Sequence, residues 1–214
     1  MARKKTHYEC TECGGRTPRW SGRCPECGSW NTLEECQTDG SGRKKRSADE
    51  VQACELKEVT WDRQPRMDTG CGELDRVLGG GLLRGSTILL GGEPGVGKST
   101  IVLETLGEMA ADRKCLYLAC EESLSQVKLR ADRVGVGGSS MVVSAETDLE
   151  SICALMENEE PDVVAIDSIQ MVNADGVDSL PGSLKQLKTC GSELVRRAKL
   201  QNCALFLIGH VTKK

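Results

Sequence analysis

The most specific chemical pattern in the chain is the glycine-rich stretch 91–100, Gly-Gly-Glu-Pro-Gly-Val-Gly-Lys-Ser-Thr. It fits the pattern G-x-x-x-x-G-K-[ST], in which backbone N–H groups surround the phosphates of a nucleoside triphosphate. Gly95 and Gly97 allow the backbone conformations that such a loop requires. Lys98 is expected to reach the β- and γ-phosphates, and the Ser99 hydroxyl is expected to bind Mg²⁺. A glycine-rich turn that only resembles this pattern is the alternative.

The segments on either side of this stretch favour the nucleotide-binding interpretation. Residues 86–90 form an apolar run that predicts a buried strand, and the apolar residues within 101–106 predict one face of a helix. The loop then lies between a strand end and a helix start, where the positive end of the helix dipole favours phosphate. The predicted nucleotide-binding residues are Gly92, Glu93, Pro94, Gly95, Val96, Gly97, Lys98, Ser99 and Thr100.

Carboxylates follow two other apolar runs, at the strand ends where a parallel sheet binds its ligand. Asp167 follows the run 163–166 and is predicted to bind Mg²⁺, usually through water. A carboxylate that only caps a turn is the alternative. Glu121 and Glu122 come after a second run, and either is able to act as general base towards the water that attacks the γ-phosphate. Either residue is also able to cap the next helix.

His210 ends the last apolar run, 204–209, as a polar residue at the edge of an otherwise apolar strand. It is a candidate sensor of the γ-phosphate, with a purely structural histidine as the alternative. The stretch 170–183 after Asp167 has no helical or strand pattern and contains glycine and proline. Long loops in compact domains are usually functional or mobile, so this one is a candidate DNA-binding loop, with a simple connector as the alternative.

Four cysteines near the N-terminus form two C-x-x-C pairs: Cys10, Cys13, Cys24 and Cys27. Four thiolates predict a closed tetrahedral Zn²⁺ site with a structural role. The segment is too small to bury its own core, so metal binding would supply its folding energy. Two disulfides or a redox pair are the alternatives. Trp20 and Trp30 are expected to cover the site.

Arginines at 16, 19 and 23 lie between the two cysteine pairs, where they either contact a nucleic acid backbone or form a solvated face. The overall composition does not indicate a nucleic-acid partner, because the formal net charge is −4 and not basic. Aromatic residues make up 3%, which argues against a base-stacking surface as the main binding mode. The other eight of the 12 cysteines show no pairing rhythm, which indicates a reducing compartment.

No apolar run approaches the length of a membrane span, so no membrane partner is expected. The basic start of the chain leads directly into the cysteine pairs and is not a secretory signal. A short organelle transit segment remains open as an alternative.

Composition divides the chain into three parts: residues 1–36 as a four-cysteine zinc finger, 37–57 as a polar flexible linker and 58–214 as the globular core. Apolar runs alternate with helical patterns throughout the core. This alternation predicts an α/β fold with a mainly parallel sheet covered by helices on both faces. The expected strands are 86–90, 114–119, 141–144, 163–166 and 204–209, and the expected helices run from the phosphate loop to about 112, then 127–134, 149–158 and 184–201.

Taken together, these motifs resemble the bacterial RadA family, also called Sms, of RecA-like P-loop ATPases. The resemblance covers nearly the whole chain. It is carried by the cysteine pairs with residues 18–22, by 69–82, by the phosphate loop, by Glu121-Glu122-Ser123, by 166–170 and by 209–213. The finger combined with the last two motifs is highly specific, whereas the phosphate loop alone would not be.

The resemblance implies a DNA-dependent ATPase that uses ATP and Mg²⁺ and drives branch migration or unwinding during recombinational repair. It implies a homo-oligomeric ring, a hexamer in the full-length form, on single-stranded or branched DNA in the bacterial cytoplasm, with a recombinase as a further partner. It assigns Glu121 as the catalytic glutamate and His210 as the γ-phosphate sensor, with Lys98 in the catalytic set. The finger is associated with DNA or partner interactions.

The chain also departs from the family pattern. The family continues past residue 214 with the rest of the ATPase core and a Lon-protease-like domain, so the sequence is expected to be a truncated portion. Cys120 stands where the family commonly has glycine. A zinc-anchored nucleotide-binding scaffold with slow or no turnover is therefore the alternative function, and a kinase-like phosphotransferase is a weaker one.

Overall fold

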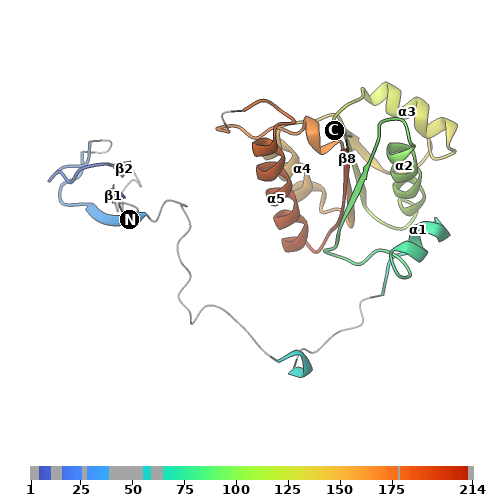
Figure 1. Cartoon of the computed structure of the whole chain (residues 1–214), viewed down its shortest axis with the longest axis horizontal. Helices are drawn as coiled ribbons and strands as arrows, with labels where there is room; N and C mark the ends of the chain where they lie inside the picture. The colour runs from blue at the N-terminus through green and yellow to red at the C-terminus, as the bar shows by residue number, and fades with distance from the viewer. Residues whose placement is uncertain are drawn as a thin grey trace. The chain divides into compact units, whose positions relative to one another are not determined.

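The computed structural model describes residues 5–10, 16–25, 28–38, 55–58, 65–177 and 179–211. The chain divides into two compact units, residues 1–61 and 62–214, and each unit is described by itself. Figure 1 shows strands in the first unit and a sheet with flanking helices in the second. Within residues 39–64 the structure describes only residues 55–58, of which Leu56–Glu58 form the short 3₁₀ helix η2.

The first unit contains a three-stranded antiparallel sheet. Its strands are β1 (Lys5–Cys10), β2 (Arg16–Thr17) and β3 (Leu33–Thr38), in the order β2-β1-β3. The register pairs Cys10 with Leu33 and Lys5 with Thr38. β3 therefore continues two residues beyond the boundary at residue 36 that composition predicts, because pairing with β1 orders a polar segment that resembles a linker. The rest of the predicted linker, 39–54, lies outside the described residues.

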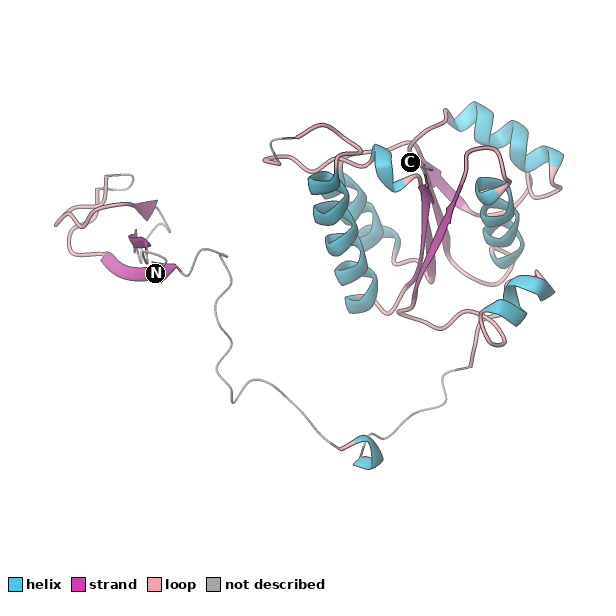
Figure 2. Ribbon diagram, in the orientation of Figure 1, coloured by secondary structure: helices cyan, strands magenta, loops and turns pink. Residues whose placement is uncertain are grey.

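The second unit is built on a five-stranded sheet in which all paired strands are parallel (Figure 2). The strand order is β4-β8-β7-β5-β6, so segments far apart in the sequence lie side by side. The sheet confirms the α/β fold class, and its order brings the carboxyl ends of β4, β8, β7 and β5 to one edge. The strands are β4 (Thr87–Gly92), β5 (Cys115–Ala119), β6 (Val142–Ser144), β7 (Val163–Asp167) and β8 (Ala204–His210).

Helices cover both faces of this sheet (Figure 1). In β5, Tyr117 packs into the cluster that includes residues of α2 and α3, whereas its neighbours Leu116 and Leu118 pack into the cluster of α4 and α5. This alternation explains why the central strands are continuously apolar, since both of their faces are buried. The helices are α1 (Gly72–Val77), α2 (Lys98–Met109), α3 (Leu124–Arg133), α4 (Leu149–Glu159) and α5 (Leu184–Leu200).

Polar caps determine where three of these helices begin. The Ser123 side chain accepts the Gln126 N–H and the Gln126 side chain accepts the Ser123 N–H, a capping box that starts α3 three residues earlier than the apolar pattern predicts. Asp148 caps α4 and Ser183 caps α5 through single side-chain bonds. None of the helices in the described part of the chain is both long and apolar enough to cross a membrane.

Candidate nucleotide site and metal centre

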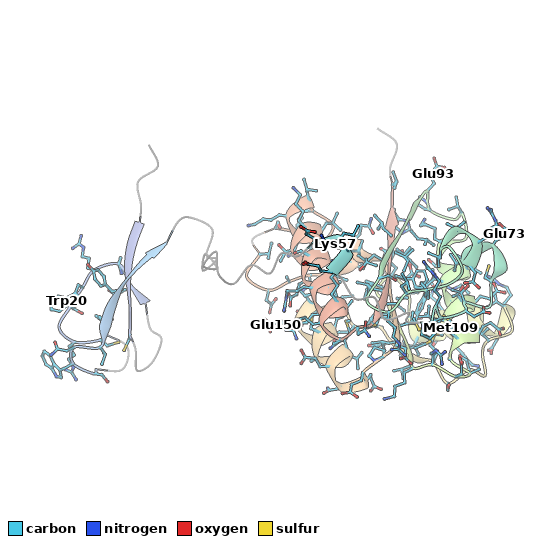
Figure 3. The ribbon with its side chains drawn as sticks, turned by 90° about the horizontal axis from the view of Figure 1, so that it is seen from below. Trp20, Lys57, Glu73, Glu93, Met109 and Glu150 are labelled. Atoms are coloured by element: carbon cyan, nitrogen blue, oxygen red, sulfur yellow. The ribbon has the colours of Figure 1, made fainter. Side chains whose placement is uncertain are left out.

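The glycine-rich loop joins β4 to α2, as the sequence predicts. Gly95 and Gly97 have φ values of 82° and 93°, and Gly97 caps the N-terminus of α2. A Cβ atom placed on either glycine would meet no protein atom within 4 Å, so the space beside the loop is open. Glu93 lies at the tip of the loop (Figure 3). The geometry leaves room for phosphate at a helix N-terminus, where backbone N–H groups and the helix dipole favour an anion.

Lys98 occupies the inside of this loop. Its residue is 8% exposed, and its ammonium donates to the carbonyl oxygens of Gly92 at 2.9 Å and Glu93 at 2.8 Å. The Lys98 Nζ also lies 3.4 Å from His210 Nδ1, because the parallel register places Gly92 of β4 beside His210 of β8. The ammonium is thus held by neutral acceptors next to the open space, from which it is able to turn towards a phosphate.

Ser99 and Asp167 form the second part of the site. The Ser99 hydroxyl donates to Asp167 Oδ1 at 2.9 Å, and Asp167 is 5% exposed at the end of β7. Hydroxyl and carboxylate oxygens are the ligands that Mg²⁺ prefers. The donor set therefore fits the predicted Mg²⁺ site.

Glu121 and His210 lie against each other at the same edge of the sheet. His210 Nε2 is 3.0 Å and 3.3 Å from the two Glu121 carboxylate oxygens. The Lys98 ammonium can only donate hydrogen bonds, so the His210 Nδ1 that faces it is the acceptor. His210 Nε2 then carries the ring proton and donates it in a hydrogen bond to Glu121. The Ser168 hydroxyl also donates to Glu121. The structure thus brings together Lys98, His210 and Glu121, three residues that come from α2, β8 and the end of β5.

Glu122 points to a different partner. Its two carboxylate oxygens lie 3.3 Å from Arg130 Nη1 and 3.2 Å from Arg130 Nη2. The two adjacent glutamates therefore have different surroundings. Glu121 belongs to the network around the loop, and Glu122 belongs to a pair with α3.

Two contacts of Asp167 could not be expected from the motifs. The Tyr117 hydroxyl donates to Asp167 Oδ2, and Arg130 Nη2 lies 3.7 Å from the same oxygen. Burial, together with the charge of Asp167, raises the pKa of Tyr117 well above its ordinary value, so the phenol stays neutral. A tyrosine within an otherwise apolar strand was the available signal, because a buried phenol needs a partner.

Cys120 is buried directly before Glu121. Its Sγ lies 3.4 Å from the Glu146 carbonyl oxygen. Burial, with the nearby charges of Asp167 and Glu121, raises the pKa of the Cys120 thiol to about 12. Cys120 is therefore a neutral thiol beside the site.

Two of the four predicted zinc ligands belong to the described residues. Cys10 and Cys24 are both 2% exposed and pack with Leu33 in one cluster. The Gly28 N–H donates to the Cys24 carbonyl at 2.9 Å, and Gly28 has a φ of 76°. This tight turn after Cys24 fits a metal-binding knuckle, and thiolates are suitable zinc ligands. Cys13 and Cys27 lie outside the described residues.

The expectation that two tryptophans cover the zinc site is wrong. Trp20 is 58% exposed and Trp30 is 70% exposed, and Figure 3 shows Trp20 at the outside of its unit. The Trp30 ring instead supports the Arg23 guanidinium, which lies 5.8 Å from the ring centroid. The buried partner of the two described cysteines is Leu33.

The loop after Asp167 is fixed by one buried amide. Gln186 Oε1 accepts the Ala174 N–H at 2.9 Å, and its Nε2 donates to the carbonyls of Ala174, Val177 and Ser179 at 3.2, 3.4 and 3.2 Å. Leu180 on this loop is 81% exposed. The candidate DNA-binding loop is thus anchored in its middle, at Ala174, Val177 and Ser179, and exposes Leu180 directly after these residues.

Sequence profiles identify the class of protein to which this site belongs. The profile of the AAA domain matches residues 51–214, and that of the rubredoxin metal binding domain matches residues 8–35. The chain therefore belongs to the AAA domain family and carries an N-terminal zinc-ribbon module. These matches support nucleotide binding in the second unit and zinc in the first.

Individual relatives narrow the comparison further. The chain is 45% identical over 218 residues to the DNA repair protein RadA of Pseudomonas aeruginosa, covering 100% of this chain and 48% of the relative. It is 42% identical over 218 residues to the protein of the same name from Escherichia coli, covering 98% and 47%. The Bacillus subtilis protein of that name is 39% identical over 221 residues, covering 100% and 48%. The resemblance to the RadA family is confirmed, and the chain spans about half the length of these relatives.

Proposed function

We propose that this chain is the ATP-hydrolysing portion of a DNA-dependent repair ATPase of the RadA type. The observation that carries the proposal is the convergence of Lys98, Ser99, Asp167 and Glu121 at one edge of the sheet, beside an open loop at a helix N-terminus. These four side chains supply the groups that phosphoryl transfer to water needs.

Each residue has a distinct role in the proposed reaction. The N–H groups of the loop bind the phosphates of ATP, and Lys98 turns from the two carbonyls to the β- and γ-phosphates. Ser99 and Asp167 would hold Mg²⁺, which neutralises charge on the phosphates when bound. Glu121 orients the attacking water and accepts its proton. His210, between Lys98 and Glu121, responds to the presence of the γ-phosphate.

DNA enters the proposal through the relatives, which are named as DNA repair proteins. We infer that the partner is single-stranded or branched DNA and that the protein forms a homo-oligomeric ring, hexameric in the full-length form. Its inferred role is branch migration or unwinding, together with a recombinase, in the bacterial cytoplasm. The loop 170–183 is the proposed DNA contact near the nucleotide. The zinc module, with Cys13 and Cys27 completing the ligands, is the proposed second contact with DNA or a protein.

One observation favours the alternative, a nucleotide-binding scaffold with slow turnover. Glu121 is bound by both His210 and Ser168. Both partners contact Oε1, so this oxygen must release one of them before it accepts a proton from water. Slow hydrolysis is what the scaffold function expects, whereas a motor would need DNA to release Glu121, so the effect of DNA on the rate separates the two functions.

The deciding experiment measures steady-state ATP hydrolysis with and without single-stranded DNA. The full-length Pseudomonas aeruginosa relative serves as a comparison, and Lys98→Met serves as the inactive control. Stimulation of the chain by DNA supports the motor function. Tight ATP binding with the same slow rate in the presence and absence of DNA would establish the scaffold instead.

A further inference from the structure

We infer that Tyr117 and Arg130 position the Asp167 carboxylate for divalent metal binding, and that Glu122 holds Arg130 in place. The inference rests on the proposed function, because it takes Asp167 as the metal-binding carboxylate. It adds three positioning residues that lie behind Asp167, on β5, on α3 and in the turn between them.

The two oxygens of Asp167 have separate partners. Oδ1 accepts the Ser99 hydroxyl at 2.9 Å, on the side of the phosphate loop. Oδ2 accepts the Tyr117 hydroxyl, on the side of β5. A carboxylate bound from both sides cannot rotate freely about its χ2 angle. Tyr117 therefore keeps one oxygen directed at Ser99, where the metal is expected.

Arg130 adds charge to this arrangement without occupying Asp167 completely. Its Nη2 lies 3.2 Å from the Tyr117 hydroxyl and 3.7 Å from Asp167 Oδ2, beyond ordinary hydrogen-bond distance. Its side chain is 12% exposed, so its charge is only weakly screened by solvent. The guanidinium thus places a positive charge beside Oδ2 and donates to the Tyr117 oxygen, which directs the Tyr117 O–H at Asp167, while Oδ1 stays on the metal side.

Glu122 explains why Arg130 does not approach closer. The Nη1 and Nη2 atoms of Arg130 pair with the Glu122 carboxylate, at 3.3 Å and 3.2 Å, in a forked geometry. Without this pair, the arginine would be free to form a direct bond with Asp167 and compete with the metal. The capping box at Ser123 fixes the start of α3 and so sets the height of Arg130 along the helix.

A purely structural ion pair does not account for the cluster as well. The Arg130–Asp167 pair, whose side chains are 12% and 7% exposed, contributes little net stability compared with apolar packing, because both charges lose their hydration. The Arg130 Nε is also buried with no hydrogen-bond partner among the described residues, which adds a further cost. Partners behind metal ligands commonly justify such costs, because they orient the ligand and tune its affinity.

The test measures Mn²⁺ affinity by electron paramagnetic resonance in the presence of ADP, and ADP affinity separately in EDTA. The variants are Tyr117→Phe, Arg130→Gln and Arg130→Lys. The matched control is Arg133→Gln, on an exposed position of the same helix. Loss of a partner behind a metal ligand typically weakens metal affinity by about tenfold or more. We expect that loss for Tyr117→Phe and Arg130→Gln, a smaller loss for Arg130→Lys, and unchanged ADP affinity in EDTA.

Asp167→Asn separates a failure of this inference from a failure of the proposed function. If Asp167→Asn lowers Mn²⁺ affinity but Tyr117→Phe and Arg130→Gln do not, the positioning role is wrong and the metal site stands. If Asp167→Asn leaves Mn²⁺ affinity unchanged, the metal site itself is wrong, and the inference with it. Thermal unfolding is recorded for each variant. If Arg130→Gln does not fold, the conservative Arg130→Lys and Tyr117→Phe decide the outcome.

Discussion

Replacement of Lys98 by methionine tests whether its ammonium binds phosphate or stabilises the fold. Methionine keeps most of the aliphatic stem and removes the charge. In the structure the ammonium has two carbonyl acceptors, at 2.9 and 2.8 Å. Each bond to a charged donor contributes about 1.5–3 kcal/mol. The desolvation of a buried ammonium costs several kcal/mol, so the two effects nearly cancel. The free energy of unfolding without nucleotide should therefore change by about 1 kcal/mol or less.

Nucleotide binding should respond far more strongly. An ammonium about 4 Å from a phosphate charge gains about 4 kcal/mol at an effective dielectric constant near 20. Bonds to phosphate oxygens replace the carbonyl bonds that the ammonium gives up, so this exchange reduces the gain by only about 1 kcal/mol. The remaining gain of about 3 kcal/mol corresponds to a loss of roughly a hundredfold in ATP affinity.

The assay combines titration of a fluorescent ATP analogue with denaturant unfolding of the nucleotide-free chain. Lys199→Met, on an exposed position of α5, controls for the loss of one positive charge. The reasoning fails if Lys98→Met binds the analogue as tightly as the unmodified chain. It also fails if the variant loses most of its stability, since the ammonium would then serve the fold.

Three further outcomes are expected. Glu121→Gln should retain ATP and Mg²⁺ binding, but its hydrolysis rate should fall by roughly a hundredfold, as is typical when a general base is lost. Glu122→Gln should retain measurable turnover. The opposite result in the hydrolysis assay would exchange the roles of the two residues. Mass spectrometry of metal content should find one zinc per chain, lost in Cys24→Ser together with folding of the first unit, and a folded unit without metal would reject the site. The Cys120 thiol, whose pKa is raised to about 12, should have a thiolate fraction of roughly 10⁻⁴ at pH 8. Iodoacetamide should therefore modify Cys120 far more slowly than the half-buried Cys71. The rate of Cys120 modification should rise about tenfold per pH unit up to that pKa. Equal rates for the two cysteines, measured by peptide mass spectrometry, would contradict this.

The sequence predicts the core fold well because burial on both faces makes each central strand an unbroken apolar run. The strand 163–167 is an example, since all five of its residues are buried. The start of α3 is predicted less well, because polar Ser123 and Gln126 fix it and not the apolar pattern. The strands of the first unit are not predicted at all. The partners of β1 and β3 lie more than 20 residues apart, as Cys10 and Leu33 do, and the sequences of these strands are mostly polar.

The candidate site divides in the same way. Lys98, Ser99 and Asp167 are predictable because each follows or opens an element with a clear pattern. Their mutual contacts, and those of Glu121 with His210, depend on strand order, which local patterns do not contain. The sequence does not reveal the roles of Tyr117 and Arg130 for the same reason. Tyr117 lies within an apolar strand and Arg130 within a helix, and neither belongs to a motif. Sequence alone also leaves Glu121 and Glu122 equivalent, whereas their partners in the structure differ.

The most direct test of the central claim is a crystal structure of the chain with a non-hydrolysable ATP analogue and Mg²⁺. We expect the triphosphate against the N–H groups of residues 95–99, Lys98 Nζ moved from the Gly92 carbonyl to the phosphates, and the metal beside Ser99 and Asp167. A nucleotide bound elsewhere, with Lys98 still on its two carbonyls, would contradict it.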